Sequence, residues 1–171
     1  MLDKKKFLEL LTDTGYDFIL HNHKALFSVD DSSKYRGNIK GSHTKNLFLK
    51  NKKNNFFLFS CEEQTNIDLR EISKSLALGN LSFAKSEYLE NLLGIKPGSV
   101  TPFALLNNFE NNIDFYLEDK LYNSDYINFH PLTNTSTITI ATIKFVKFMI
   151  ENNKKIHIFS SSNKKILKTY G

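Results

Sequence analysis

The sequence of 171 residues contains little cysteine, proline or glycine and no tryptophan: one cysteine, three prolines and seven glycines are present. The single cysteine, Cys61, excludes a disulfide framework and argues against a zinc site built from cysteines. No apolar run approaches the ~18 residues that a membrane span requires. The basic amino terminus is followed by no charge-free apolar stretch, so it is not typical of a signal peptide. We therefore expect a soluble, cytoplasmic protein.

Aromatic residues are abundant, with 15 phenylalanines and 7 tyrosines, and this composition excludes disorder over the whole chain. A chain of this length is typical of one domain with a sizeable core. We predict one domain over residues 1–159 and a polar, basic tail over residues 160–171.

The hydrophobic pattern predicts helices and strands in mixed order. Asp3 is a candidate cap for a first helix that ends at Gly15, and Asp68 with Glu71 forms a capping box for a second helix. Further helices are expected over residues 86–93 and 143–150, and strands within residues 17–29, 46–50, 56–59, 113–117, 137–140 and 156–159. The order is not a regular alternation of strand and helix, and neither GxGxxG nor GxxxxGK[ST] is present. These patterns favour an α+β domain with a curved sheet and packed helices.

The formal net charge of +5 is distributed unevenly along the chain. The stretch from Lys34 to Lys53 contains seven cations and no acid. Such a stretch can bind a polyanion, or it can be the solvated surface of a lysine-rich protein. Charge alone leaves both interpretations open.

Three polar segments are candidates for a site, and each also has a plain structural interpretation. Residues 41–46 (GSHTKN) precede a strand, where a scaffold can present a site, although an ordinary loop has the same features. Residues 94–102 hold two prolines in a rigid loop whose N–H groups suit an oxyanion or a carbonyl, or which simply connects two elements. His130 precedes Pro131 and is thereby held out of the α region, although a lone histidine is more often structural. The five histidines show no metal-ligand spacing, so we expect no metal site.

Several motifs, in the correct order, resemble those of the YbaK/ProX superfamily of freestanding prolyl-tRNA editing proteins. They are GSHTKNLFLKNKKNNFFLFS, DLREISKSLAL, LGIKPGSVTPFALLNN and FHPLTNTSTITI, with HNHKALFSVDD as the early strand motif. The resemblance covers about residues 2–159 and is greatest to the alanyl-tRNA(Pro) deacylases.

The resemblance implies a curved, barrel-like mixed sheet flanked by helices, and an enzyme that uses no metal or cofactor. It implies hydrolysis of the ester that joins a wrong amino acid, here alanine, to tRNA(Pro). On this basis Lys45 is the catalytic residue, and the residues expected to bind the substrate are Asn46, Gly98, Ser99, Val100, Thr101, Pro102 and His130.

The resemblance also implies that the basic stretch binds the acceptor end of tRNA(Pro). It is compatible with prolyl-tRNA synthetase as a further partner. The cations expected to contact tRNA are Lys34, Arg36, Lys40, Lys50, Lys52 and Lys53. We expect a monomer. Two alternatives remain at this point: the same chemistry on tRNA charged with Cys, Ser or Thr, and a non-catalytic module that binds tRNA or a synthetase.

Overall fold

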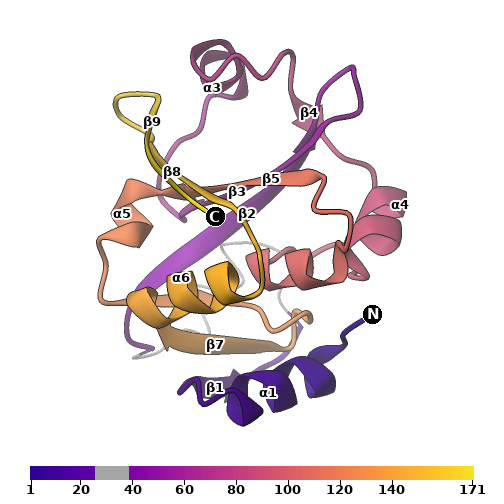
Figure 1. The fold of residues 1–171 in the computed structure, drawn as a ribbon, viewed down its shortest axis with the longest axis vertical. Coiled ribbons are helices and arrows are strands. Elements are labelled where there is room, and N and C mark those ends of the chain that lie inside the picture. The colour runs from indigo at the N-terminus through magenta and orange to yellow at the C-terminus, as the bar shows by residue number, and fades with distance from the viewer. Residues whose placement is uncertain (26–38) are drawn as a thin grey trace.

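The computed structural model describes residues 1–25 and 39–171, which form one large mixed sheet flanked by helices (Figure 1). The strands are β1 (Ile19–Asn22), β2 (Ser42–Lys50), β3 (Phe56–Glu62), β4 (Ser82–Phe83), β5 (Ile113–Glu118), β6 (Tyr126–Phe129), β7 (Ser136–Ala141), β8 (Ile156–Ser160) and β9 (Lys165–Tyr170). The helices are α1 (Lys4–Asp13), α3 (Leu69–Ser75), α4 (Ser86–Tyr88), α5 (Asp119–Tyr122) and α6 (Thr142–Glu151), with a π-helical turn η1 (Leu89–Leu93) and a 3₁₀ helix η2 (Pro102–Asn107). Within the described ranges, no helix has the length and apolar character needed to cross a membrane.

The strand order is β1-β7-β6-β2-β3-β5-β8-β9, and β4 pairs with β2 outside this path. Strands β2 and β6 are parallel, as are β3 with β5 and β5 with β8, whereas the remaining neighbours are antiparallel. The mixed fold with flanking helices is confirmed. The barrel-like closure is not found, because the described strands leave an open sheet with β1 at one edge and β9 at the other.

Capping by side chains fixes the starts of two predicted helices. The Asp3 carboxylate accepts a hydrogen bond from the Lys6 N–H at the start of α1. The Asp68 carboxylate accepts from the Arg70 and Glu71 N–H groups at the start of α3. An aspartate cap contributes about 1 kcal/mol to the stability of a helix. These helices therefore begin where the sequence predicted.

The larger hydrophobic core lies on one face of the sheet, beneath α1, α6 and η2. Its centre is a cluster of buried aromatic rings, Phe7, Phe103, Phe129, Phe145 and Phe148. The ring centroids of Phe7 and Phe103 are 4.5 Å apart, and those of Phe129 and Phe145 are 4.9 Å apart. A smaller core on the β3–β5–β8 part of the sheet packs against α3, with Phe59 stacked on Tyr116 at 4.5 Å. Both faces of the central strands are therefore occupied.

The chain after β8 is part of the sheet. Residues 165–170, which the sequence suggested as part of a polar tail, instead form β9, which pairs antiparallel with β8. The strand is mostly exposed and carries Lys165 and Lys168 at the edge of the sheet. Lysine at an edge discourages pairing with another chain, and the same exposure removes the hydrophobic alternation by which a strand is recognised.

Candidate functional site

Strand β2 carries Lys45 and Asn46 on opposite faces of the sheet. Lys45 pairs across the ladder with the buried Cys61, on the side of the smaller core. Asn46 lies on the other side, where its side-chain oxygen accepts a hydrogen bond of 2.6 Å from the Ser60 hydroxyl. Because successive residues of a strand point to opposite faces, these neighbours cannot contact one small substrate group from the same side. The structure thus separates two residues that the sequence placed together in one site.

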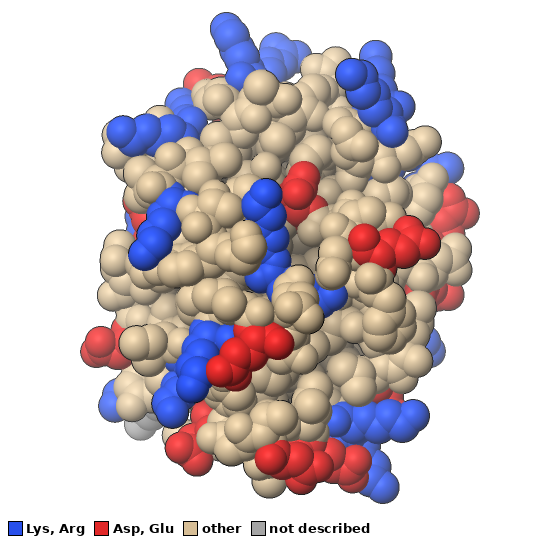
Figure 2. Space-filling model, in the orientation of Figure 1, with Lys and Arg blue, Asp and Glu red and all other residues tan. Residues whose placement is uncertain are grey.

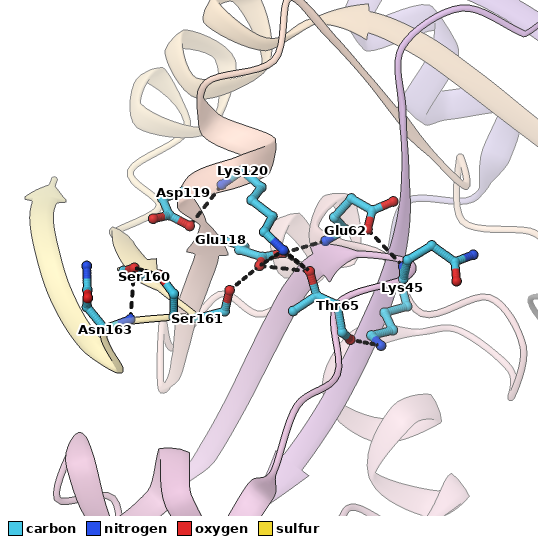
Figure 3. A network of polar contacts seen from close by, with 11 residues as sticks. Lys45, Glu62, Thr65, Glu118, Asp119, Lys120, Ser160, Ser161 and Asn163 are labelled. Carbon is cyan, nitrogen blue, oxygen red and sulfur yellow. Dashed lines mark hydrogen bonds and ion pairs between the residues drawn. The ribbon is translucent and has the colours of Figure 1, made fainter.

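The Lys45 ammonium is held by the loop that follows β3. Its Nζ donates a hydrogen bond to the carbonyl oxygen of Thr65, and the side chain is half-buried (Figure 3). The adjacent Cys61 thiol is fully buried, and burial raises its pKa, so it remains protonated and unreactive. Of the two paired side chains, Lys45 and Cys61, only Lys45 therefore carries a charge.

His130 directly follows β6, the parallel neighbour of β2. The two strands pair at Ser42 with Ile127 and at His43 with Asn128, and the Thr44 hydroxyl donates to the Asn128 carbonyl at 2.8 Å. His130 therefore emerges next to the part of β2 that carries Lys45. In the described part of the chain the two side chains are not hydrogen-bonded to each other.

The His130 ring is oriented by the strand that follows it. Nδ1 lies 2.8 Å from the Ser136 carbonyl oxygen, and since a carbonyl only accepts, Nδ1 carries the proton of the neutral ring. Burial lowers the pKa of His130, and the nearby His23 ring, 6.1 Å away between centroids, acts in the same direction. The hydrogen bond to Ser136 opposes this shift. The ring is therefore neutral near pH 7 and leaves the Nε2 lone pair as an acceptor.

A polar surface surrounds His130 on the face of β1, β7 and β6 that lies away from the larger core. Side-chain hydrogen bonds join His23 to Thr137, His21 to Thr139 and Thr139 to Asn128, at 2.9, 3.0 and 2.5 Å. His21, His23, Thr137 and Thr139 lie within the quoted motifs, but the sequence predicted no role for them or for Asn128. The alternation of threonine with isoleucine over residues 136–141 is the signal that predicts one polar and one apolar face.

The segment Gly98–Pro102 forms a tight, mostly buried connection into η2. Gly98 has a φ of +85°, which favours glycine, and Pro102 occupies the first turn of the 3₁₀ helix. Thr101 is fully buried, and its hydroxyl has no hydrogen-bond partner within residues 1–25 and 39–171. The next residue, Phe103, packs against Phe129 at 5.7 Å between ring centroids, so the end of this loop lies beneath the end of β6. Ser99 and Val100 are buried and half-buried, so neither side chain is freely available to a substrate.

The cations expected to bind tRNA lie at both ends of β2. Lys40 precedes the strand, with its ammonium 4.7 Å from the centre of the Tyr126 ring. Lys50 ends the strand, 4.9 Å from the Tyr88 ring, and Lys52 and Lys53 follow in the turn. A strand of nine residues spans roughly 27 Å, so these cations do not form one patch around Lys45. The remaining two, Lys34 and Arg36, lie outside the described residues.

The surface charge is mixed. On the face in Figure 2, basic side chains project at the end that holds α3, and acidic side chains are interspersed with lysines elsewhere. Among the residues that the structure describes, no three His, Cys, Asp or Glu side chains are grouped so that they could hold a metal ion.

Comparison with known proteins identifies the family. Residues 23–148 match the family model of the aminoacyl-tRNA editing domain, a range that includes β2, the Gly98–Pro102 loop and His130. The chain therefore belongs to the aminoacyl-tRNA editing domain family, as its motifs indicated.

The names of individual relatives refer to prolyl-tRNA or its synthetase. The chain is 30% identical to the zebrafish (Danio rerio) prolyl-tRNA synthetase associated domain-containing protein 1, over 86% of this chain and 82% of that protein. It is 23% identical to the prolyl-tRNA editing protein ProX of Acetoanaerobium sticklandii, over 81% and 85%. A solved structure described as a candidate trans-editing enzyme for prolyl tRNA synthetase has the same fold, with a TM-score of 0.63, 16% identity, and coverage of 91% and 96%.

Proposed function

We propose that this protein is a trans-editing deacylase that hydrolyses the ester between alanine and tRNA(Pro). The observation that carries the proposal is the placement of the Lys45 ammonium on β2 and of the neutral His130 ring directly after β6, the parallel neighbour of β2, in an editing domain. Its proposed place of action is the cytoplasm, where it acts as a monomer and as a hydrolase that protects translation fidelity.

An aminoacyl ester is already activated, so the enzyme has mainly to position it and to stabilise negative charge as water attacks. Lys45 provides a compact cation for the developing oxyanion or a phosphate of the terminal adenosine. His130 provides, at Nε2, an acceptor for a substrate O–H or N–H group, since Nδ1–H is engaged with Ser136. The free hydroxyl of the terminal ribose is available to assist the proton transfer.

The choice of alanine follows from size. A synthetase pocket built for proline cannot exclude the smaller alanine, because each missing methylene costs a ligand only about 1–3 kcal/mol. A second site corrects this error when it admits alanine and rejects the proline ring. The Gly98–Pro102 loop, which runs from the exposed Gly98 to the buried Pro102 at the start of η2, is our candidate for the wall of that small pocket.

The test is single-turnover deacylation of tRNA(Pro) charged in turn with Ala, Pro, Cys and Ser. We expect Ala-tRNA(Pro) to be cleaved fastest and Pro-tRNA(Pro) to be spared. A preference for Cys or Ser would retain the chemistry and change the substrate. Cleavage of Pro at the same rate as Ala would refute the size argument.

The second candidate is a non-catalytic module that binds tRNA(Pro) or prolyl-tRNA synthetase. The zebrafish relative favours it, because its name describes a domain associated with the synthetase. This candidate predicts binding of tRNA(Pro) with no deacylation of any of the four charged forms, so the same assay decides between the two.

A further inference from the structure

The carboxylate of Glu118 is fully buried, and a single residue, Thr65, is hydrogen-bonded both to it and to Lys45 (Figure 3). Glu118 is the last residue of β5, and its side chain accepts hydrogen bonds from three other segments. The Glu62 N–H donates at 2.7 Å, the Thr65 hydroxyl at 2.9 and 3.1 Å, and the Ser161 hydroxyl also donates to it. The Lys120 ammonium forms an ion pair with it at 3.9 Å.

Thr65 connects this carboxylate to Lys45. Its hydroxyl donates to Glu118 and accepts from the Lys120 ammonium at 3.2 Å, and it is itself buried. Its backbone carbonyl accepts from the Lys45 ammonium. The Thr65 side chain is therefore held by the buried Glu118 carboxylate, and the Thr65 backbone carbonyl is the acceptor that orients the Lys45 ammonium.

A buried carboxylate is a costly way to stabilise a fold, because apolar residues of similar volume are often as good or better. What a carboxylate provides and a leucine does not is a set of directed acceptors that gather donors from separate segments. Here the hydrogen-bond donors come from the end of β3, the loop after it and the β8–β9 turn, and the ion-pair partner Lys120 comes from α5. The β8–β9 hairpin, which lies beyond the residues of the family match, thereby contributes Ser161 to the support of Lys45.

We propose that Glu118 is a positioning residue that, through Thr65, holds the Lys45 ammonium in the orientation that the deacylation needs. The proposal rests on the proposed function for its kinetic test, and a second test is independent of that function.

The kinetic test uses three threonine variants. Thr65→Val removes the hydroxyl and keeps the shape, and Thr65→Ser restores a hydroxyl. Thr142→Val makes the same change at a buried threonine of α6 that has no link to Lys45. Because a misplacement of about 1 Å can cost 10²-fold in rate, we expect Thr65→Val to lower kcat roughly 10- to 100-fold with KM little changed. Thr65→Ser should recover most of the rate, and Thr142→Val should retain it.

A double-mutant cycle separates positioning from general structural damage. In a Lys45→Met background there is no ammonium to orient, so Thr65→Val should cause no further loss of rate. The proposal would be overturned if Thr65→Val lowered the rate by the same factor in the wild-type and Lys45→Met backgrounds. It would also be overturned if Thr142→Val lowered the wild-type rate as much as Thr65→Val does. Glu118→Gln, which keeps the shape but loses the charge and one acceptor, should behave as Thr65→Val does.

The test that needs no enzymatic activity is chemical labelling. Limited acetylation with an amine-reactive reagent, followed by mass spectrometry, measures the reactivity of each lysine. We expect Thr65→Val to change the labelling rate of Lys45 several-fold and to leave that of the exposed Lys5 unchanged. An unchanged rate at Lys45 would refute the positioning role even in an active enzyme. A changed rate in a protein that cleaves no charged tRNA would support the network and refute the proposed function.

Discussion

Replacement of Lys45 by methionine is the most direct perturbation of the proposed site. Methionine keeps an unbranched apolar stem in the half-buried position on β2 and removes the ammonium. One preorganised charge-stabilising contact is worth about 2.7–4 kcal/mol in the transition state, which corresponds to a loss of roughly 10²–10³ in rate. We therefore expect Lys45→Met to reduce the single-turnover deacylation rate by that factor.

The fold should survive this change. The variant loses the hydrogen bond from the Lys45 ammonium to the Thr65 carbonyl, and a bond from a charged group contributes about 1.5–3 kcal/mol to stability. For a chain of this size, each 1 kcal/mol lowers the melting temperature by about 2–4 °C, so the protein loses several degrees and remains folded at assay temperature. The large effect on rate and the small effect on melting separate a catalytic role from a structural one.

The assay is single-turnover hydrolysis of Ala-tRNA(Pro), with melting followed by circular dichroism. The matched control is Lys144→Met, which removes an exposed lysine of α6 and should retain the wild-type rate and melting temperature. A Lys45→Met protein with unchanged kinetics would exclude Lys45 from the chemistry.

Three further predictions concern Thr101, His130 and the basic residues. Thr101→Val removes a buried hydroxyl without a described partner, so unfolding experiments should show stability unchanged or raised by about 1 kcal/mol; a clear loss would reveal a partner. Because the pKa of His130 is lowered in the folded protein, the unfolded chain binds the extra proton first, and stability should fall as pH drops below about 6.5. His130→Asn should show a shallower pH dependence in denaturant titrations, and an identical slope would contradict the shift. Raising salt should weaken tRNA(Pro) binding in filter assays, and Lys50→Ala should reduce the salt slope by about 1 if this end of β2 contacts phosphate.

Much of the fold could be predicted from the sequence because its determinants are local. The caps Asp3 and Asp68 mark where α1 and α3 begin, and Gly94, with a φ of +64°, ends η1 where the sequence predicted. The central strands β3, β5 and β8 carry dense apolar runs because both of their faces are covered.

The elements that were missed depend on distant partners. The apolar run of η2 is buried on every side, so no helical period is visible in it. Strand β9 has almost no buried side chain and is a strand because β8 provides its hydrogen bonds. Strand β6 is four residues long and is placed by pairing with both β2 and β7.

The candidate site, like the fold, could be predicted from the sequence only in part. The motifs indicated Lys45 and His130, but the sequence did not indicate Glu118, because an acid at the end of a strand is usually exposed. Its burial results from the convergence of Thr65 and Ser161, which lie 53 and 43 residues away along the chain. Contacts of this kind are visible only after the chain has folded.

The core and the polar surface are two faces of the same strands, and this links stability to function. On β6, Ile127 and Phe129 are buried in the larger core. Asn128 lies between them, and on the other face its side-chain oxygen accepts a hydrogen bond from the Thr139 hydroxyl. On β7, Ile138 and Ile140 are buried in the same way between Thr137, Thr139 and Ala141. Since side chains alternate along a strand, each apolar residue that anchors the core also fixes the orientation of its polar neighbours. A one-residue slip of β7 would turn its threonines toward the larger core and its isoleucines away from it, so the hydrophobic core also sets the register of the polar surface around His130.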